Sequence, residues 1–137
     1  MIRKMKPTDI DNIMTVWLTA NLEAHPFIDS KYWYQNVSAV RNAILQAEVY
    51  CFVDNLDQVN GFIGLQGSYI AGLFVTKHYR SQHIGTTLLN IAKEKHQVLT
   101  INVYMKNQAA INFYCHNGFN ITKHSDIEAE MTWSKIK

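Results

Sequence analysis

The sequence has few of the residues that build disulfide-stapled or linker-rich proteins. It contains two cysteines, Cys51 and Cys115, two prolines and six glycines in 137 residues. Two cysteines in a chain without an apolar leader fit a reduced, cytoplasmic compartment better than a disulfide scaffold. With so few prolines and glycines, and without repeats, no linker is indicated, and the length predicts a single domain over residues 1–137.

Long apolar runs and an excess of one charge are also missing. No run approaches the roughly 20 apolar residues that span a bilayer, so we expect no membrane segment. Thirteen Lys and Arg residues against eleven Asp and Glu residues give a net charge of +2, and the basic residues are scattered, so no nucleic-acid surface is indicated. The six histidines lack the compact spacing of metal ligands, and we expect no metal site.

Apolar periodicity predicts helices and strands in alternation. Helical spacing predicts a first helix with apolar positions at residues 10–22, a second that buries Trp33, Val37, Val40 and Ile44, and two more at 84–95 and 108–117. Alternation of period two predicts strands near 2–4 and at 49–53, 59–65, 69–75, 99–104, 120–124 and 127–134. This order indicates an α/β fold with a mixed central sheet of about seven strands flanked by about four helices.

Residues 73–89 contain the strongest local signal for a ligand. They run from an apolar strand, through a polar turn with Lys77, His78 and Arg80, into a helix. The first N–H groups of a helix have no intrahelical partner, and the helix dipole is positive there, so this segment predicts a site for a phosphate-bearing ligand. The alternative is a plain helix start with a convenient glycine, Gly85. No Gly-Lys-Ser/Thr follows, which disfavours a Walker-type loop.

Two motifs in this order resemble one known family. Residues 80–85 read Arg-Ser-Gln-His-Ile-Gly, and residues 107–119 begin with Asn, carry a Phe-Tyr pair and end with Gly-Phe. The first resembles the acetyl-CoA signature of the GNAT family of N-acetyltransferases, and the second resembles that family's C-terminal pattern. Upstream, His-Pro-Phe-Ile at residues 25–28, followed by Tyr32 and Trp33, resembles a bacterial subgroup that includes protein-lysine acetyltransferases.

The resemblance implies an acetyl-CoA cleft between the strand at 69–75 and the helix at 108–117. In the family this strand splays from its neighbour, and its main chain, here at Phe74 and Val75, pairs with the pantetheine arm. Asn107 bonds the pantetheine from the other side, although a plain helix cap explains this residue equally well. The expected cofactor contacts are completed by Ala110 and by the pyrophosphate loop of Arg80, Ser81, Gln82, His83, Ile84, Gly85 and Thr86.

One position in this loop departs from the family pattern. His83 stands where the family has its first glycine. A side chain there crowds the backbone that approaches the pyrophosphate, or instead adds a hydrogen bond or charge to a phosphate. The sequence leaves both outcomes open.

The resemblance also implies the chemistry. The tyrosine of the second motif, here Tyr114, donates a proton to the departing CoA thiolate, whereas the plain alternative is a buried aromatic residue. Many members carry a carboxylate at the position of Asn102, which cannot act as a base. Glu23 and His25, or Tyr69 and Tyr104 through a water, are the remaining candidates. His25 titrates nearest neutrality, but a histidine that only structures a turn fits equally well.

The expected activity is direct acetyl transfer from acetyl-CoA to a primary amine, namely a protein lysine or N-terminus, or a small amine. The expected partners are therefore acetyl-CoA and an amine acceptor, with the protein as a monomer or homodimer. Phe27, Tyr32 and Tyr34 could wall an acceptor pocket. A catalytically weak or inactive CoA-binding regulatory module is the main alternative, because of His83 and Asn102. A protein-interaction domain without a small ligand is the third.

Overall fold

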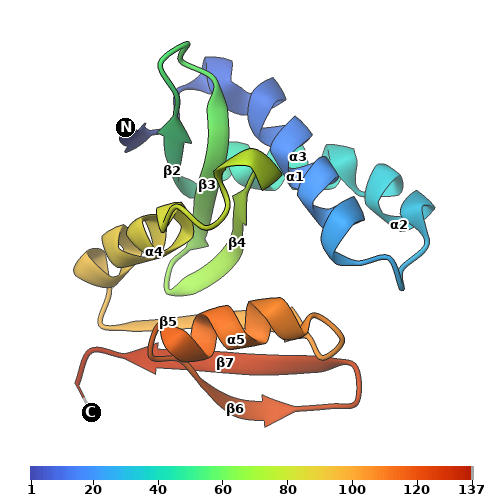
Figure 1. Ribbon diagram of the computed structural model, residues 1–137, viewed down its shortest axis with the longest axis vertical. Helices are drawn as coiled ribbons and strands as arrows, with labels where there is room; N and C mark the ends of the chain where they lie inside the picture. Colours follow the sequence, from blue (N-terminus) through green and yellow to red (C-terminus); the bar gives the residue numbers. More distant parts are fainter. Residues whose placement is uncertain (137) are drawn as a thin grey trace.

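A seven-stranded mixed sheet lies at the centre of the structure, a computed structural model that describes residues 1–136 (Figure 1). The strands lie in the order β1-β2-β3-β4-β5-β7-β6, and neighbours are antiparallel except for the parallel pair β4 and β5. Their bounds are β1 (Ile2–Lys4), β2 (Glu48–Val53), β3 (Val59–Gln66), β4 (Tyr69–Val75), β5 (Val98–Tyr104), β6 (Asn120–His124) and β7 (Glu128–Ser134). The predicted α/β class and seven-stranded mixed sheet are confirmed.

The described residues form five α-helices, where about four were expected. They are α1 (Ile10–Ala24), α2 (Ser30–Gln35), α3 (Val37–Gln46), α4 (Ile84–Lys95) and α5 (Gln108–His116). The extra helix arises because the predicted second helix breaks at Asn36, whose amide donates to the Tyr32 carbonyl at 2.7 Å. Such side-chain bonds compete with the helical ladder. None of the helices within residues 1–136 is long and apolar enough to cross a membrane.

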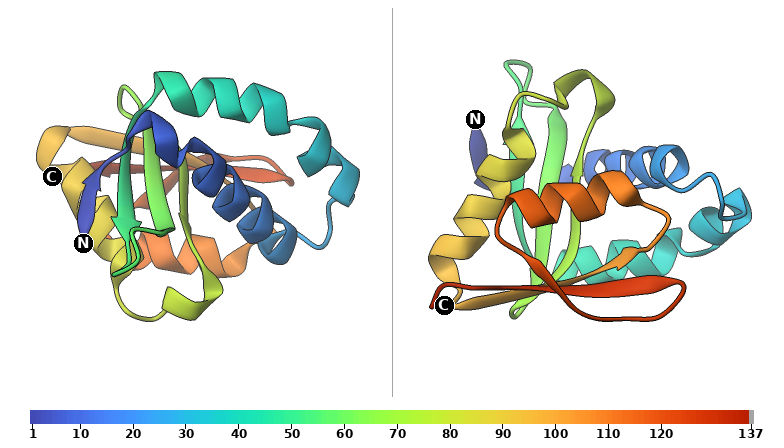
Figure 2. Two further views of the ribbon diagram at one scale, coloured as in Figure 1. Left: turned by 90° about the horizontal axis from the view of Figure 1, so that it is seen from above. Right: turned by 60° about the horizontal axis from the view of Figure 1, so that its bottom comes forward.

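Helices cover both faces of the sheet, so each face has its own hydrophobic core (Figure 2). The first core joins α4 and α5 to strand residues such as Tyr50 and Ile63. The second joins α1, α2 and α3 to residues such as Cys51 and Phe62. Tyr50 and Cys51 are neighbours that lie in different cores because successive strand residues point to opposite faces.

The strands β4 and β5 separate almost as soon as they meet. Their ladder contains one pair, Tyr69 with Thr100, although each strand has seven residues. The register of β4 with β3 shifts between Gly64 and Leu65, which leaves Ala71 of β4 as an extra residue. A bulge of this kind bends a strand and increases its twist. The bend turns the rest of β4 away from β5 and leaves the edge of β4 open.

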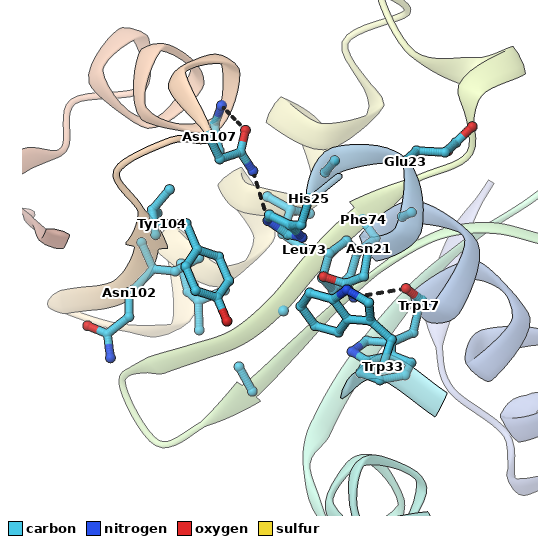
Figure 3. Close-up of a pocket in the computed structure, with 18 of the residues that line it drawn as sticks. Trp17, Asn21, Glu23, His25, Trp33, Leu73, Phe74, Asn102, Tyr104 and Asn107 are labelled. Carbon is cyan, nitrogen blue, oxygen red and sulfur yellow. Dashed lines mark hydrogen bonds between the residues drawn. The ribbon is translucent and has the colours of Figure 1, made fainter. Parts of the chain in front are cut away.

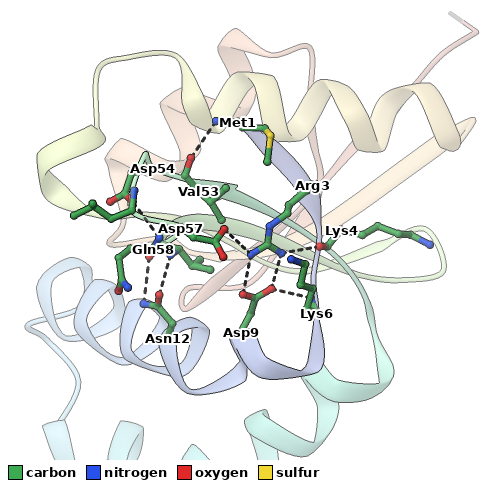
Figure 4. A network of polar contacts seen from close by, with 12 residues as sticks. Met1, Arg3, Lys4, Lys6, Asp9, Asn12, Val53, Asp54, Asp57 and Gln58 are labelled. Atoms are coloured by element: carbon green, nitrogen blue, oxygen red, sulfur yellow. Dashed lines mark hydrogen bonds and ion pairs between the residues drawn. The ribbon is translucent and has the colours of Figure 1, made fainter.

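An ion pair connects β1 to the beginning of α1 (Figure 4). The Arg3 Nη1 atom lies 2.7 Å from Oδ2 of Asp9, and Nη2 lies 3.0 Å from Oδ1. Asp9 ends the 3₁₀ turn η1 (Pro7–Asp9) and also accepts a hydrogen bond of 2.7 Å from the Lys6 backbone N–H. The Arg3 hydrogen bonds hold the pKa of Asp9 below its usual range. The contact fixes the beginning of the helix whose other end reaches the cleft described next.

Candidate functional site

A cleft of about 680 Å³ opens where β4 and β5 separate (Figure 3). Its walls come from the end of α1, from α2, from β4 and β5, and from the start of α5. The lining includes eight of the predicted site residues, namely Glu23, His25, Phe74, Val75, Arg80, Asn107, Ala110 and Tyr114. The six others, residues 81–86, lie outside this lining, in the turn and the first turn of α4 that follow Arg80.

The main chain of β4 turns polar groups toward the cleft at alternate residues. The Thr76 N–H donates to the Asn60 carbonyl at 2.9 Å, so this pair is of the hydrogen-bonded type. Hydrogen-bonded and non-hydrogen-bonded pairs alternate along antiparallel strands. The main chain of Phe74 is therefore hydrogen-bonded to Phe62 of β3. The N–H and C=O groups of Leu73 and Val75 point the other way, toward the open edge. Of the two residues expected to offer their main chain, Val75 has this orientation, and Phe74 contributes only its side chain.

The loop before α4 has an unusual backbone. Ser81 has φ of 72°, and His83 has φ of 61° and ψ of 17°. This left-handed region is one that glycine adopts readily and other residues rarely. His83 thus keeps a backbone conformation typical of glycine, at a cost of about 1–2 kcal/mol, while its side chain is exposed to solvent. The loop conformation therefore does not depend on a glycine at position 83.

The start of α4 is shaped to receive an anion and packs against α5. The N–H groups of Ile84, Gly85 and Thr86 have no intrahelical partner, and a helix N-terminus favours negative charge. A Cβ atom built on Gly85 would lie 3.3 Å from the ring of Phe113 on α5. A glycine at this position therefore lets the loop lie close to the helix that carries Tyr114.

Arg80 is tied to two other elements of the site. Its Nε donates to the Val75 carbonyl at 2.9 Å, and its Nη2 lies 2.9 Å from Oε1 of Glu23. The pair links the end of α1 to the loop before α4, across the end of β4. Glu23 therefore contacts Arg80 in this structure, and the Arg80 guanidinium has a carboxylate beside it.

Tyr114 is a buried aromatic residue that also reaches the cleft. It lies on α5, is 4% exposed and lines the cleft. Its ring meets Phe113 and Phe119 edge-on, with centroids 5.1 and 5.2 Å away. Burial raises the pKa of Tyr114 well above its usual value because the phenolate would be poorly solvated. The hydroxyl therefore keeps its proton at neutral pH.

The end of α1 and the start of α5 meet at His25 and Asn107. Asn107 Oδ1 accepts a hydrogen bond of 3.2 Å from the Ala110 N–H, which confirms the expected helix cap, and Asn107 Nδ2 lies 3.2 Å from His25 Nε2. The His25 ring stacks on Trp33 and meets Tyr104 edge-on, with centroid distances of 5.2 and 5.0 Å. This burial lowers the pKa of His25, so the imidazole is neutral at pH 7.

The other candidate proton acceptors are less suited to neutral pH. Asn102 lines the cleft on β5, and its amide accepts no proton. Tyr69 and Tyr104 also line the cleft, and burial raises the pKa of both. Among these groups, His25 is the one whose neutral form offers a nitrogen lone pair that can accept a proton. Tyr32 lines the cleft beside it, whereas Tyr34 is exposed and lies outside the lining.

The cleft also contains residues that the sequence prediction did not name, among them Leu73 and Asn21. Leu73 follows from strand alternation, since it lies two residues before Val75 and shares its edge. Asn21 lies one helical turn before His25, and its amide donates to the Trp17 carbonyl at 2.9 Å. A polar residue on the buried face of a predicted helix is the signal that would find it. No group of three or more His, Cys, Asp or Glu side chains within residues 1–136 is placed to hold a metal ion.

Comparisons with known proteins agree with this geometry. A family model described as an acetyltransferase (GNAT) domain matches residues 46–121. Peptidyl-lysine N-acetyltransferase YiaC of Escherichia coli is 33% identical over 122 residues, which cover 88% of this chain and 84% of YiaC.

Two solved structures have similar folds. The solution structure of apo-form YjaB from Escherichia coli has a TM-score of 0.84 at 25% identity and covers 97% of this chain and 96% of its own. The PaiA N-acetyltransferase from Thermoplasma acidophilum, solved with coenzyme A, has a TM-score of 0.83 at 20% identity and covers 98% of both chains.

Proposed function

Because this chain belongs to the GNAT family of acetyltransferases, we propose that it transfers the acetyl group of acetyl-CoA to the side-chain amine of a protein lysine. Membership of the family makes acetyl-CoA the donor. The lysine acceptor is proposed from the similarity to YiaC, a peptidyl-lysine N-acetyltransferase. The observation that carries the proposal is that the open edge of β4, Arg80 at the start of the loop before α4, and Tyr114 meet around one cleft.

The residues of the cleft fit the parts of acetyl-CoA. The N–H and C=O groups of Leu73 and the N–H group of Val75 can pair with the amides of a pantetheine arm as a neighbouring strand would, whereas the Val75 carbonyl already accepts a hydrogen bond from Arg80. The N–H groups at the start of α4 and the Arg80 guanidinium suit the pyrophosphate. When bound, acetyl-CoA supplies an acetyl group activated as a thioester. These contacts would bring that group to the end of β4, between α1 and α5.

Tyr114 is the proposed proton donor. The reaction breaks the C–S bond of the thioester and forms a C–N amide bond, so the sulfur that leaves needs a proton. Tyr114 is protonated at neutral pH and reaches the cleft from α5. General acids of this kind contribute about 10²- to 10⁴-fold to a rate.

His25 is the proposed proton acceptor. A lysine ammonium with a pKa of about 10.4 must lose a proton before it can attack, which costs roughly 4 kcal/mol at neutral pH. Two protons leave the nitrogen in all: one ends on the CoA sulfur through Tyr114, and the other reaches solvent through His25. The neutral His25 ring lies at the cleft among aromatic side chains. Glu23, another candidate for this role, is paired with Arg80.

The test is thiol release from acetyl-CoA in the presence of lysine peptides, N-terminal peptides and small amines, with calorimetry of CoA binding in parallel. Acetylation of the lysine ε-amine in preference to the other acceptors is the expected result. Binding of CoA without turnover of any acceptor would instead identify a CoA-binding module. An absence of CoA binding would contradict the proposed use of the cleft.

A further inference from the structure

The contact between His25 and Asn107 identifies which nitrogen of the imidazole carries the proton, because the orientation of the Asn107 amide is fixed. Its oxygen faces a main-chain donor, the Ala110 N–H, at 3.2 Å. Turning the amide over would set its NH₂ group against that N–H. The group that faces His25 Nε2 at 3.2 Å is therefore the NH₂ group, which is a donor only.

A donor at this distance determines the tautomer of the imidazole. His25 Nε2 must act as the acceptor, so the single proton of the neutral ring lies on Nδ1. The protonated ring would point an N–H at the NH₂ group of Asn107, and this repulsion opposes protonation. Burial acts in the same direction and lowers the pKa of His25, and it outweighs the contact with the Asn21 main chain, which acts to raise it.

Other groups around His25 do not replace this contact. Trp33 of α2 and Tyr104 of β5 offer ring faces and edges, and Phe27 of the loop after α1 meets the ring edge-on. Three charged groups contact residues around His25. The Lys106 ammonium lies 5.6 Å from the Phe27 ring centroid, and Glu23 pairs with Arg80. The charge of Glu128 helps to raise the pKa of Tyr104. Tyr32 also interacts with Tyr104. Asn107 is the side chain hydrogen-bonded to Nε2 among the described residues.

We propose that Asn107 is a positioning residue that keeps His25 neutral with its lone pair on Nε2, and that CoA bound in the cleft releases this lone pair by taking the Asn107 amide. The second half rests on the proposed function. Both residues line the cleft, and their contact joins α1 to α5 across it. The proton acceptor is then available only once the acyl donor is in place.

The Asn107→Asp variant tests the first half without breaking the fold. Asp and Asn are equally good at the N-cap, so one carboxylate oxygen can still accept from the Ala110 N–H, and the charge suits a helix N-terminus. The second oxygen faces His25 as an acceptor in place of a donor. We expect the proton to move to Nε2 and the pKa of His25 to rise by about one to three pH units.

The measurement is ¹⁵N NMR of histidine-labelled protein across pH, with His25→Gln to assign the resonances. Asn112→Asp is the matched control because it adds the same charge on the exposed side of α5, and His25 should titrate there as in the wild type. A wild-type Nε2 that carries the proton, or an Asn107→Asp variant with an unchanged tautomer and pKa, would overturn the positioning role.

The second half is tested by adding coenzyme A to the wild-type protein. Release of Nε2 predicts a changed Nε2 resonance and a higher pKa for His25, because the opposing NH₂ group is withdrawn. The acidic limb of the pH profile of kcat/KM should move upward in Asn107→Asp by the same amount as the pKa. CoA that binds by calorimetry but leaves His25 unchanged would overturn the release alone. CoA that does not bind would overturn the proposed function, and the release with it.

Discussion

The ion pair between Glu23 and Arg80 makes a quantitative prediction about CoA affinity. Arg80 is proposed to contact the pyrophosphate, yet its guanidinium lies 2.9 Å from a carboxylate of α1. Glu23 competes with a phosphate for this cation and repels the anion. The Glu23→Gln variant keeps the size and hydrogen-bonding capacity of the side chain and removes its charge, so we expect it to bind CoA more tightly than the wild type.

The exposure of the pair sets the size of the effect. The side chains of Arg80 and Glu23 are 42% and 37% exposed. Pairs this accessible contribute about 0–1 kcal/mol, and about 1 kcal/mol corresponds to roughly a fivefold change in Kd. The Arg80→Gln variant loses a charge-assisted contact worth about 1.5–3 kcal/mol, which predicts binding weaker by about ten- to hundredfold.

Isothermal titration with CoA at low and high salt checks both numbers. The gain in Glu23→Gln should shrink at high salt because the charges are exposed to screening. It should vanish in the Arg80→Gln background, since the two changes act through one contact. Asp11→Asn is the control, because it breaks another exposed pair on α1, with Arg41. Weaker CoA binding in Glu23→Gln would show that Glu23 positions Arg80 instead, and the reasoning would be wrong.

Three further predictions concern the acid, the anchor of α1 and the loop. Tyr114→Phe should lower kcat about 10²-fold or more while CoA affinity stays within twofold, with the exposed Tyr34→Phe as its control, and an unchanged kcat would remove Tyr114 from the mechanism. Asp9→Asn should lower the free energy of unfolding in urea by about 3 kcal/mol, against at most about 1 for the exposed Asp57→Asn. Because the folded-state pKa of Asp9 is depressed, the stabilisation by its ion pair is present above the unfolded-state pKa near 4 and is lost as pH falls through the folded-state pKa. The free energy of unfolding of Asp9→Asn should therefore depend less on pH in this range than that of the wild type. His83→Gly should leave stability unchanged or raise it by up to about 1 kcal/mol, because it relieves a left-handed non-glycine residue, and a clear loss would show that the imidazole is needed.

Much of the fold could be predicted because its signals are local. In the last strand Ala129 and Met131 are fully buried, and alternation alone predicts this. The start of α5 follows from Asn107, whose side chain caps the helix as its residue type predicts. The bounds of α4 follow likewise from apolar spacing.

The features that shape the cleft have no comparable local signal. The bulge at Ala71 lies in a strand without proline and depends on how β3 and β4 pair. The contact between His25 and Asn107 joins residues 82 positions apart, and only the completed sheet brings them together. The sequence signal for the break between α2 and α3 is the single residue Asn36. The resemblance to the family therefore indicated eight residues that line the cleft, but not the contacts between them.

These contacts explain why the site lies where the two cores meet. Asn107 and Tyr114 come from the side of α5, in the first core, and Glu23 and His25 come from the end of α1, in the second. Between them β4 leaves β5, so the main-chain groups of Leu73 and the N–H group of Val75 lose the partners that a continuous sheet would give them, while Arg80 bonds the Val75 carbonyl. Unpaired main-chain groups inside a protein cost free energy unless water or a ligand bonds them. A ligand that pairs with this edge therefore replaces missing ladder bonds, and it would lie between the proposed acid, Tyr114, and the proposed base, His25.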